Sequence, residues 1–176
     1  KPQILESLGE EKGRAVITYL QFVLDKGIDW NSAFCTWIYQ RVQLGHTFAR
    51  HGFPIKWTLA EMPFAGPRSG AAWALDQVLD AYEGIAELMR PVHERLGEEG
   101  PPFKLLNRTA AHMPEVGNSS VDLVCIDPPY YNNVQYGELS DYFYVWEKRT
   151  LGDLYPELFR RRLTNKQDEA VANPVR

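Results

Sequence analysis

The sequence predicts an α/β protein with a parallel sheet and a helical hairpin at its N-terminus. Apolar residues recur at helical spacing in residues 10–26 and 71–90, which is typical of amphipathic helices. Short apolar runs typical of strands occur at residues 55–59, 103–106 and 121–126. Because strands that alternate with helices usually form parallel sheets, we expect a helical segment, residues 1–52, and an α/β domain, residues 53–176, packed as one compact unit.

Two helices are expected in the first segment. In residues 10–26 the apolar side chains that share one face are Val16, Leu20, Val23 and Leu24, and Gly27 follows as a stop signal. A second helix is expected to begin at Asn31 or Ser32 and to run through about residue 49, since both residue types cap helices well. Together the two helices would form the hairpin.

The second segment, residues 53–176, is predicted to alternate between strands and helices. A short strand at 55–59 leads into a loop at 62–70 and a helix at 71–90, where Pro91 is expected to mark an end or a kink. After a break at 97–102, strands are expected at 103–106 and 121–126, the latter apolar enough to be buried on both faces, with Cys125 in the core. Helices are expected at 139–149 and from Pro156, followed from Asn165 by a tail that is ordered only in part.

Composition narrows the function classes. The chain has 176 residues, of which 44% are hydrophobic and 24% charged, as in an ordinary globular domain. A net charge of −4 argues against a broad nucleic-acid-binding face, because phosphate contacts dominate such binding. The only dense basic stretch is the run of arginines at 160–162, for which a solvated helix face is the more ordinary interpretation.

Cellular context follows from what the sequence lacks. Cys35 and Cys125 are far apart and have no metal-ligand spacing, so neither a disulfide framework nor a metal site is predicted. No apolar stretch approaches the roughly 20 residues of a membrane span, and no signal peptide is visible. We therefore expect a cytoplasmic protein without a membrane partner. Lys1 in place of an initiator Met indicates a fragment of a longer protein.

The sequence Asp127-Pro128-Pro129-Tyr130 carries the strongest functional signal. It follows directly on the strand predicted at 121–126, at the edge where parallel sheets bind ligands. Adjacent prolines cannot donate to a strand ladder and hold the backbone extended, so they stiffen the exit from the strand. The Asp127 carboxylate and the Pro128 carbonyl are then placed to accept the N–H bonds of an aromatic amine, while Tyr130 stacks on its ring. The simpler alternative is a rigid turn with Tyr130 in the core.

The tetrapeptide resembles the (D/N/S)PP(Y/F) signature of AdoMet-dependent amino-methyltransferases. The longer run at 121–149 resembles a narrower group, the adenine-specific DNA methylases that often contain a zinc ribbon. Residues matching that group's pattern are Tyr131, Asn133, Tyr136, Leu139, Ser140, Asp141, Phe143, Tyr144, Val145 and Trp146, with Lys56, Trp57, Glu61, Pro63 and Phe64 upstream. The resemblance covers roughly residues 53–165. It implies a partial or compact Rossmann-like methyltransferase sheet, with S-adenosyl-L-methionine as cofactor and Tyr131, Asn133 and Tyr136 as substrate-binding residues.

The expected cofactor site is less complete than the amine site. The family's ribbon cysteines are absent, and its glycine-rich AdoMet loop lies further upstream in full-length members. The loop at 63–70 offers a substitute, with Pro63, Phe64, Gly66 and Gly70 as candidate cofactor-binding residues and Glu61 as a candidate ribose or amino-group ligand. An ordinary connecting loop explains the same residues equally well, because glycine-rich loops are weak signals by themselves.

The resemblance implies methyl transfer to an exocyclic amino group, with adenine N6 in DNA as the expected acceptor. Asp127, Pro128, Pro129 and Tyr130 are the candidate catalytic residues. In duplex DNA the base would have to be flipped out. The same chemistry on RNA guanine N2 or on a glutamine amide is one alternative, and a non-catalytic methylase-like module that binds DNA or protein is another. DNA is the expected partner, together with other subunits or the remainder of a longer chain.

Overall fold

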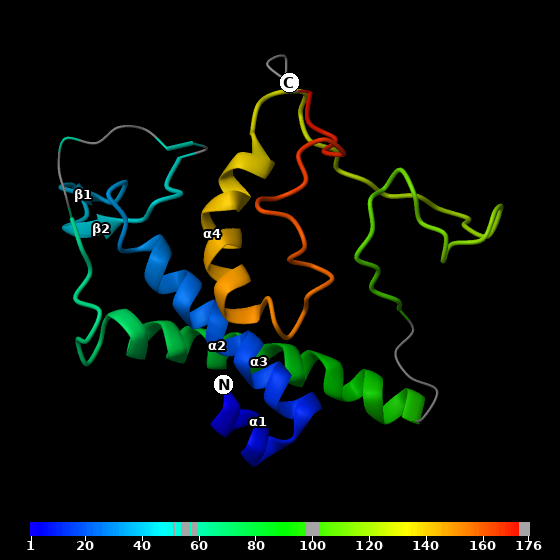
Figure 1. The fold of residues 1–176 in the computed structure, drawn as a ribbon, viewed down its shortest axis with the longest axis horizontal. Helices are drawn as coiled ribbons and strands as arrows, with labels where there is room; N and C mark the ends of the chain where they lie inside the picture. The colour runs from blue at the N-terminus through cyan, green and yellow to red at the C-terminus, as the bar shows by residue number, and fades with distance from the viewer. Residues whose placement is uncertain (51, 54–56, 58–59, 98–102, 173–176) are drawn as a thin grey trace.

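The computed structural model describes residues 1–176 except 51, 54–56, 58–59, 98–102 and 173–176. Its described residues form the helices α1 (Pro2–Leu8), α2 (Glu10–Asp29), α3 (Gly70–Leu96) and α4 (Tyr136–Leu151), and the strands β1 (Thr36–Ile38) and β2 (Gln43–Gly45). Helix α2 packs against α1, α3 and α4, and it runs through the centre of Figure 1. The protein is therefore a mixed α/β protein in which helices predominate. None of the helices in the described ranges is long and apolar enough to cross a membrane.

The helix predicted at 10–26 is confirmed, and as α2 it continues to Asp29. Gly27 does not end the helix; it is buried in its last turn, because the ring of Phe64 packs against it. A further helix, α1, precedes α2 and was not predicted. Gly9, at φ +77°, separates the two helices, and Leu5 of α1 packs onto Gly13 of α2.

The helix predicted from Asn31 through about residue 49 is wrong. This segment instead forms an antiparallel hairpin in which Thr36 pairs with Gly45 and Trp37 with Leu44. The end of α2 determines this path, since the Asp29 carbonyl accepts hydrogen bonds from the Thr47 backbone N (2.8 Å) and from Thr47 Oγ1 (2.6 Å). The chain must therefore return to the point where α2 ends, and a continuous helix cannot return within so few residues.

The two other long helices are confirmed. α3 begins next to the predicted position and continues beyond Pro91 to Leu96, so the proline does not end it. α4 includes the predicted 139–149 and begins earlier, at Tyr136. No helix opens at Pro156. Turns follow α4 instead, and they place Leu154 beside Leu151 and against Ile17 of α2 in the hydrophobic core.

The strands predicted at 103–106 and 121–126 are not formed. Both segments are irregular, and the second is widely exposed, with Leu123 82%, Val124 72% and Ile126 76% accessible. Cys125, expected in the core, is also exposed. A strand needs a hydrogen-bonding neighbour, and among the described residues the only sheet is the antiparallel pair β1–β2. The strand predicted at 55–59 lies almost wholly outside the described residues.

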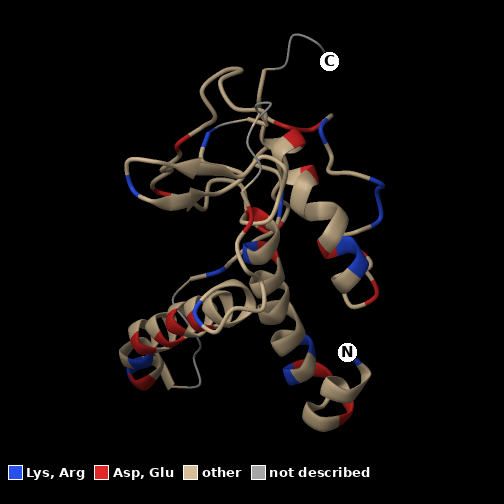
Figure 2. Cartoon of the chain, turned by 90° about the vertical axis from the view of Figure 1, so that its left-hand side faces the viewer, with Lys and Arg blue, Asp and Glu red and all other residues tan. Residues whose placement is uncertain are grey.

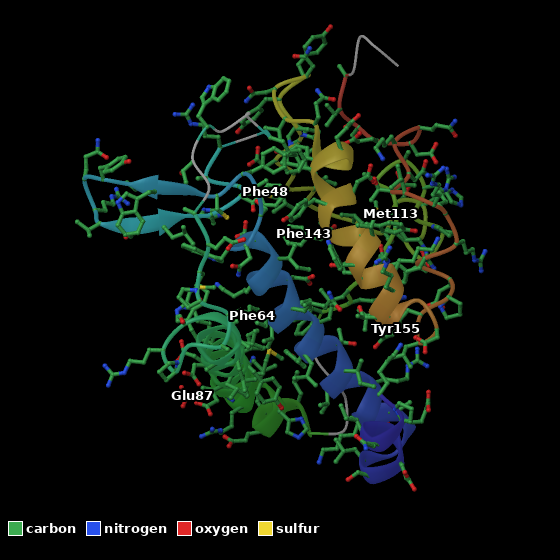
Figure 3. All side chains as sticks on the ribbon, turned by 60° about the vertical axis from the view of Figure 1, so that its left-hand side comes forward. Phe48, Phe64, Glu87, Met113, Phe143 and Tyr155 are labelled. Carbon is green, nitrogen blue, oxygen red and sulfur yellow. The ribbon has the colours of Figure 1, made fainter. Side chains whose placement is uncertain are left out.

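The contact between α2 and α4 combines polar and aromatic interactions. The Tyr142 hydroxyl donates to the Ile28 carbonyl at 2.9 Å, and the Thr150 hydroxyl donates to Gln21 Oε1. Phe143 stacks on Phe48, with ring centroids 5.2 Å apart, and Figure 3 shows both rings between the upper turns of α4 and the hairpin. These contacts fix both the rotation of α4 and its height along α2.

The same interface holds two carboxyl groups with raised pKa values. Partial burial is the main cause that raises the pKa of Asp25 to about 6. A hydrogen bond from Gln21 lowers this pKa, and the charge of Glu147 on α4 raises it. Burial also raises the pKa of Glu147. Ionisation of Asp25 therefore opposes the packing of α4 on α2.

Asp25→Asn should stabilise the protein above pH 6. Because the folded-state pKa of Asp25 is raised, the folded protein favours the protonated carboxyl. The stability that this protonated form contributes is complete below about pH 4 and is lost as the pH rises through 6. At pH 7.5 the variant should be more stable by about 1 kcal/mol, less than full burial would give, because the site is only partly buried. Urea denaturation at pH 4.5 and 7.5 measures the difference. Asp80→Asn on the exposed face of α3 is the control, and an equal gain at both pH values would contradict the assignment.

Candidate functional site

The Asp127–Tyr130 tetrapeptide lies in an irregular segment that leads toward α4. The Tyr130 hydroxyl donates a hydrogen bond to Asp127 Oδ1 at 3.2 Å, so the two polar side chains face each other. They border a cavity of about 280 Å³, whose remaining lining residues are Pro128, Pro129, Tyr136, Glu169, Ala170 and Val171. We call this cavity the DPPY pocket. It brings together all four candidate catalytic residues and one candidate substrate-binding residue, Tyr136.

A tight turn follows the tetrapeptide. The Tyr131 N–H donates to the Pro129 carbonyl and the Asn133 N–H to the Tyr130 carbonyl, each at 3.0 Å. Tyr131 adopts a left-handed conformation, with φ 50°, which is uncommon for a residue other than glycine. The Pro128 carbonyl receives no hydrogen bond from the described residues and thus remains available as an acceptor. The side chains of Tyr131 and Asn133 are exposed beside the pocket but do not line it.

The C-terminal segment 164–172 closes the DPPY pocket from the opposite side. Glu169 Oε1 accepts a hydrogen bond from the Gly137 N–H at 2.6 Å, which satisfies a free donor at the start of α4 and is favoured by the helix dipole. The Ala172 N–H donates to the Tyr131 carbonyl at 3.2 Å. These two contacts connect the tail to both the turn and the helix, so the pocket is formed by residues distant in sequence.

Asp141 anchors this segment to α4. Its carboxylate pairs with the Lys166 amine at 2.5 Å and accepts hydrogen bonds from the Thr164 N–H and hydroxyl. Desolvation raises the pKa of Asp141, but the hydrogen bonds from Lys166 and Thr164 outweigh it, so the pKa lies below its usual value. Asp141, which matches the family pattern, therefore serves here to hold the tail.

A second and larger cavity, of about 800 Å³, lies where α2, α4 and the segment 61–64 meet. We call it the α2–α4 pocket. Three candidate cofactor-binding residues line it, namely Glu61, Pro63 and Phe64. Its other lining residues are Leu24, Gly27, Ile28, Asn31, Met62, Tyr142 and Trp146. Asn31 bonds to the Gly27 carbonyl through its Nδ2 and to the Met62 N–H through its Oδ1, so it ties the segment 61–64 to α2.

Gly66 and Gly70 shape the loop but do not line this pocket. The Gly66 N–H is bonded to the Pro63 carbonyl at 3.2 Å, so in this conformation it is not directed at a ligand. Gly70 has φ +59°, and a Cβ there would lie 2.0 Å from the Phe64 carbonyl oxygen. That carbonyl accepts the Ala71 N–H at 3.0 Å. Both glycines thus permit close packing of the loop, which favours the connecting-loop interpretation of these two residues.

The two pockets have no residue in common, but both border α4. Tyr136 lines the DPPY pocket, whereas Tyr142 and Trp146 line the α2–α4 pocket. At 1.5 Å of rise per residue, the two sets lie about 9–15 Å apart along the helix axis. The structure therefore gathers the candidate amine-binding residues in one cavity and three of the candidate cofactor residues in another.

Some lining residues were not predicted from the sequence. Tyr142 and Trp146 stand four positions apart, a spacing that places two side chains on one face of a helix and that offered a signal for a shared pocket. The sequence predicts Gly27 as a helix stop and Asn31 or Ser32 as a helix cap, and neither pattern indicates a pocket. Nothing in the sequence marks Glu169, because its role depends on the return of the tail to α4.

Comparisons with protein-family models, with curated proteins and with solved structures find no match to this chain. The resemblance to amino-methyltransferases therefore depends on the residues of the motifs alone. Within the part of the chain that the structure describes, no group of three or more His, Cys, Asp or Glu side chains is arranged to hold a metal ion.

Gly27→Ala should destabilise the protein through the α2–α4 pocket. A Cβ at Gly27 would lie 2.5 Å from Phe64 Cε2, so the ring must move. Alanine favours a helix by up to about 1 kcal/mol, but overpacking costs roughly 1–3 kcal/mol. Gly84→Ala in α3 is the matched control. A Cβ there meets nothing within 4 Å, so this variant gains only the higher helix propensity of alanine.

Urea denaturation should place Gly27→Ala about 1–3 kcal/mol below Gly84→Ala in stability, because the gain in helix propensity is common to both variants. Adding Phe64→Ala to Gly27→Ala should recover part of the difference, because the smaller side chain no longer meets the new Cβ. Equal effects of the two glycine substitutions would show that Phe64 does not pack on α2.

Proposed function

We propose that this chain is an AdoMet-dependent amino-methyltransferase domain whose acceptor is N6 of adenine in DNA. The observation that carries the proposal is the DPPY pocket, in which Asp127, Pro128 and Tyr130 border one small cavity. The hydrogen bond between Tyr130 and Asp127 orients the carboxylate, and the ring of Tyr130 is exposed and free to stack on a base.

The Asp127 carboxylate and the Pro128 carbonyl would act as hydrogen-bond acceptors for the substrate amine. An amine attached to an aromatic ring is a weak nucleophile, because its lone pair is delocalised into the ring. Asp127 Oδ2 and the Pro128 carbonyl would accept its two N–H bonds and favour a tetrahedral nitrogen with a localised lone pair. When bound, AdoMet would supply the methyl group as an electrophile and would leave with the electron pair of its methyl–sulfur bond, while Asp127 and the Pro128 carbonyl would hold the attacking nitrogen. The proton released from nitrogen goes to Asp127 or to water.

The α2–α4 pocket is the proposed place of the cofactor, which supplies an electrophilic methyl group when bound. Its volume lies within the range typical of small-molecule sites. The carboxylate of Glu61 suits ribose hydroxyl groups, and Tyr142 and Trp146 offer aromatic surface to an adenine ring. The residues present therefore fit an adenosine group. The loop amides do not favour a carboxylate ligand here, because the Gly66 N–H is bonded within the loop.

The proposal includes a Rossmann-like sheet in which residues 121–126 pair as a strand. Leu123 and Val124 point to opposite faces of any strand, and both are widely exposed in the isolated chain. Burying apolar surface contributes about 25 cal/mol per Å², so such a segment gains stability wherever neighbouring strands are available. Another subunit or a further part of a longer chain is the proposed source of those strands.

A second candidate function is a non-catalytic binding module. The separation of the DPPY pocket from the α2–α4 pocket favours it, because methyl transfer requires donor and acceptor in one site. The two candidates differ in whether the chain alone binds AdoMet and transfers its methyl group.

Calorimetric titration of the chain with AdoMet is the first test, and we expect saturable binding below millimolar concentration. Transfer of a labelled methyl group should then occur to DNA in preference to RNA or a glutamine-containing peptide. Asp127→Ala should lower the rate by about 10²–10³-fold, as is usual for loss of a transition-state contact, while leaving the affinity for AdoMet unchanged.

Asp122→Ala removes an exposed acid from the same segment and is the matched control, for which we expect an unchanged rate. Tyr130→Phe should retain most of the activity, since the stacking ring remains, whereas Tyr130→Ala should not. Absence of AdoMet binding at millimolar concentration would reject catalysis by this chain alone. Equal rates for Asp127→Ala and Asp122→Ala would reject the role of the carboxylate.

A further inference from the structure

Three consecutive arginines, Arg160, Arg161 and Arg162, follow α4 in an irregular segment that we call the arginine triplet. All three side chains are exposed. Among the described residues none of their guanidinium groups has a hydrogen bond or an ion pair. The helix face expected for this run is not formed. The triplet therefore presents three unneutralised cations on a turn.

The backbone of this turn is fixed to α4. The Arg161 carbonyl accepts hydrogen bonds from the Tyr144 hydroxyl at 2.9 Å and from the Lys148 amine. The ring of Phe159 packs on Tyr144, with centroids 5.4 Å apart. Two donors on one carbonyl and an aromatic contact hold the turn in place, so the arginines require little additional ordering of the backbone before they bind a ligand.

The surroundings of the triplet are also basic. Lys148 and Arg149 occupy the last turn of α4, where Figure 2 shows Lys and Arg positions, and the Arg149 guanidinium lies 5.6 Å from the ring centroid of Trp146. Of the acids close to it in sequence, Asp153 is paired with Lys1 at 2.6 Å, and Glu157 is exposed. Residues 148–162 hold five basic and two acidic side chains, so this stretch is positive although the whole chain has a net charge of −4.

We propose that the arginine triplet binds the phosphodiester backbone of DNA. The inference rests on the proposed function, and it assigns the surface that holds the substrate while the DPPY pocket takes the base. Guanidinium groups bind phosphate oxygens through paired hydrogen bonds and remain charged at any physiological pH. Binding of this kind is independent of sequence, so it positions the strand without selecting the base.

α4 sets the distance between the two contacts. Tyr136 borders the DPPY pocket, whereas Tyr144 and Lys148 hold the triplet. The helix rises about 1.5 Å per residue, so the triplet lies about 12–18 Å along the axis from the pocket. Each strand of DNA advances about 3.4 Å per nucleotide, so the phosphates bound should lie roughly four or five nucleotides from the target base.

The salt dependence of DNA binding tests the proposal without any need for catalysis. The 176-residue chain is titrated into a labelled 30-base-pair duplex at several salt concentrations in the absence of AdoMet. Replacing all three arginines by glutamine should make the slope of log Kobs against log[salt] less negative by about 2–3, since each phosphate contact contributes about 0.9. Replacing them by lysine should leave the slope nearly unchanged, because the three charges remain.

The matched control replaces Arg41, Arg90 and Arg95 by glutamine, which removes the same charge from the hairpin turn and the end of α3. Its slope should equal that of the original chain. Equal slopes for the triplet variant and this control would overturn the proposal. A single strand and an RNA duplex serve as competitors, and tighter binding of RNA would overturn the assignment to DNA. Loss of methyl transfer with DNA binding retained would reject the proposed catalysis but leave this surface assigned.

Discussion

The packing of α4 against α2 is the contact on which the rest of the structure depends. The bond from the Tyr142 hydroxyl to the Ile28 carbonyl fixes the height of α4, and the stacking of Phe143 on Phe48 fixes its rotation. With α4 in this position, Tyr142 and Trp146 complete the α2–α4 pocket, and Tyr136 completes the DPPY pocket. The same helix holds the tail through Asp141. One helix therefore positions both candidate cavities and the segment that closes one of them.

Carboxylates on the two sides of α4 respond to pH in opposite directions. Toward α2, burial raises the pKa of Asp25 and of Glu147, so their ionised forms weaken the helix contact. Toward the tail, desolvation of Asp141 is outweighed by its bonds to Lys166 and Thr164, so its pKa is lowered and its ionised form strengthens the contact. Acidification thus favours the packing of α2 on α4 and weakens the contact between Asp141 and the tail. Glu169 and Val171 of that tail line the DPPY pocket.

The three long helices α2, α3 and α4 could be predicted from the sequence and the sheet could not, for a physical reason. A helix satisfies its backbone within a few residues, so the apolar spacing in α2, α3 and α4 was sufficient to predict them. The strand expected at 121–126 needs a neighbour, and its exposed Leu123 and Val124 show that apolar character alone does not create one. The sequence predicts a helix cap at Asn31 or Ser32, but the hydrogen bonds from Thr47 to the Asp29 carbonyl override that local preference. In the candidate site, too, the local part could be predicted and the tertiary part could not. The contiguous residues Asp127–Tyr130 could be identified from the sequence, whereas Glu169 reaches the pocket only through the return of the tail to α4.

The proposed methyl transfer requires that the DPPY pocket and the α2–α4 pocket be joined. Because Tyr136 and Trp146 belong to one helix, their separation along it is fixed, and only the segments that meet α4 can shorten the path between the pockets. The segment 61–64 is held by Asn31, by Gly27 and by the Ala71 N–H, so its position is determined on several sides. The DPPY segment is held at its end by Asn133 and Ala172, whereas its beginning continues into the unpaired residues 121–126. Pairing of 121–126 in a sheet would thus move Asp127 first, so a strand partner for this segment would also change the alignment of the candidate amine-binding residues.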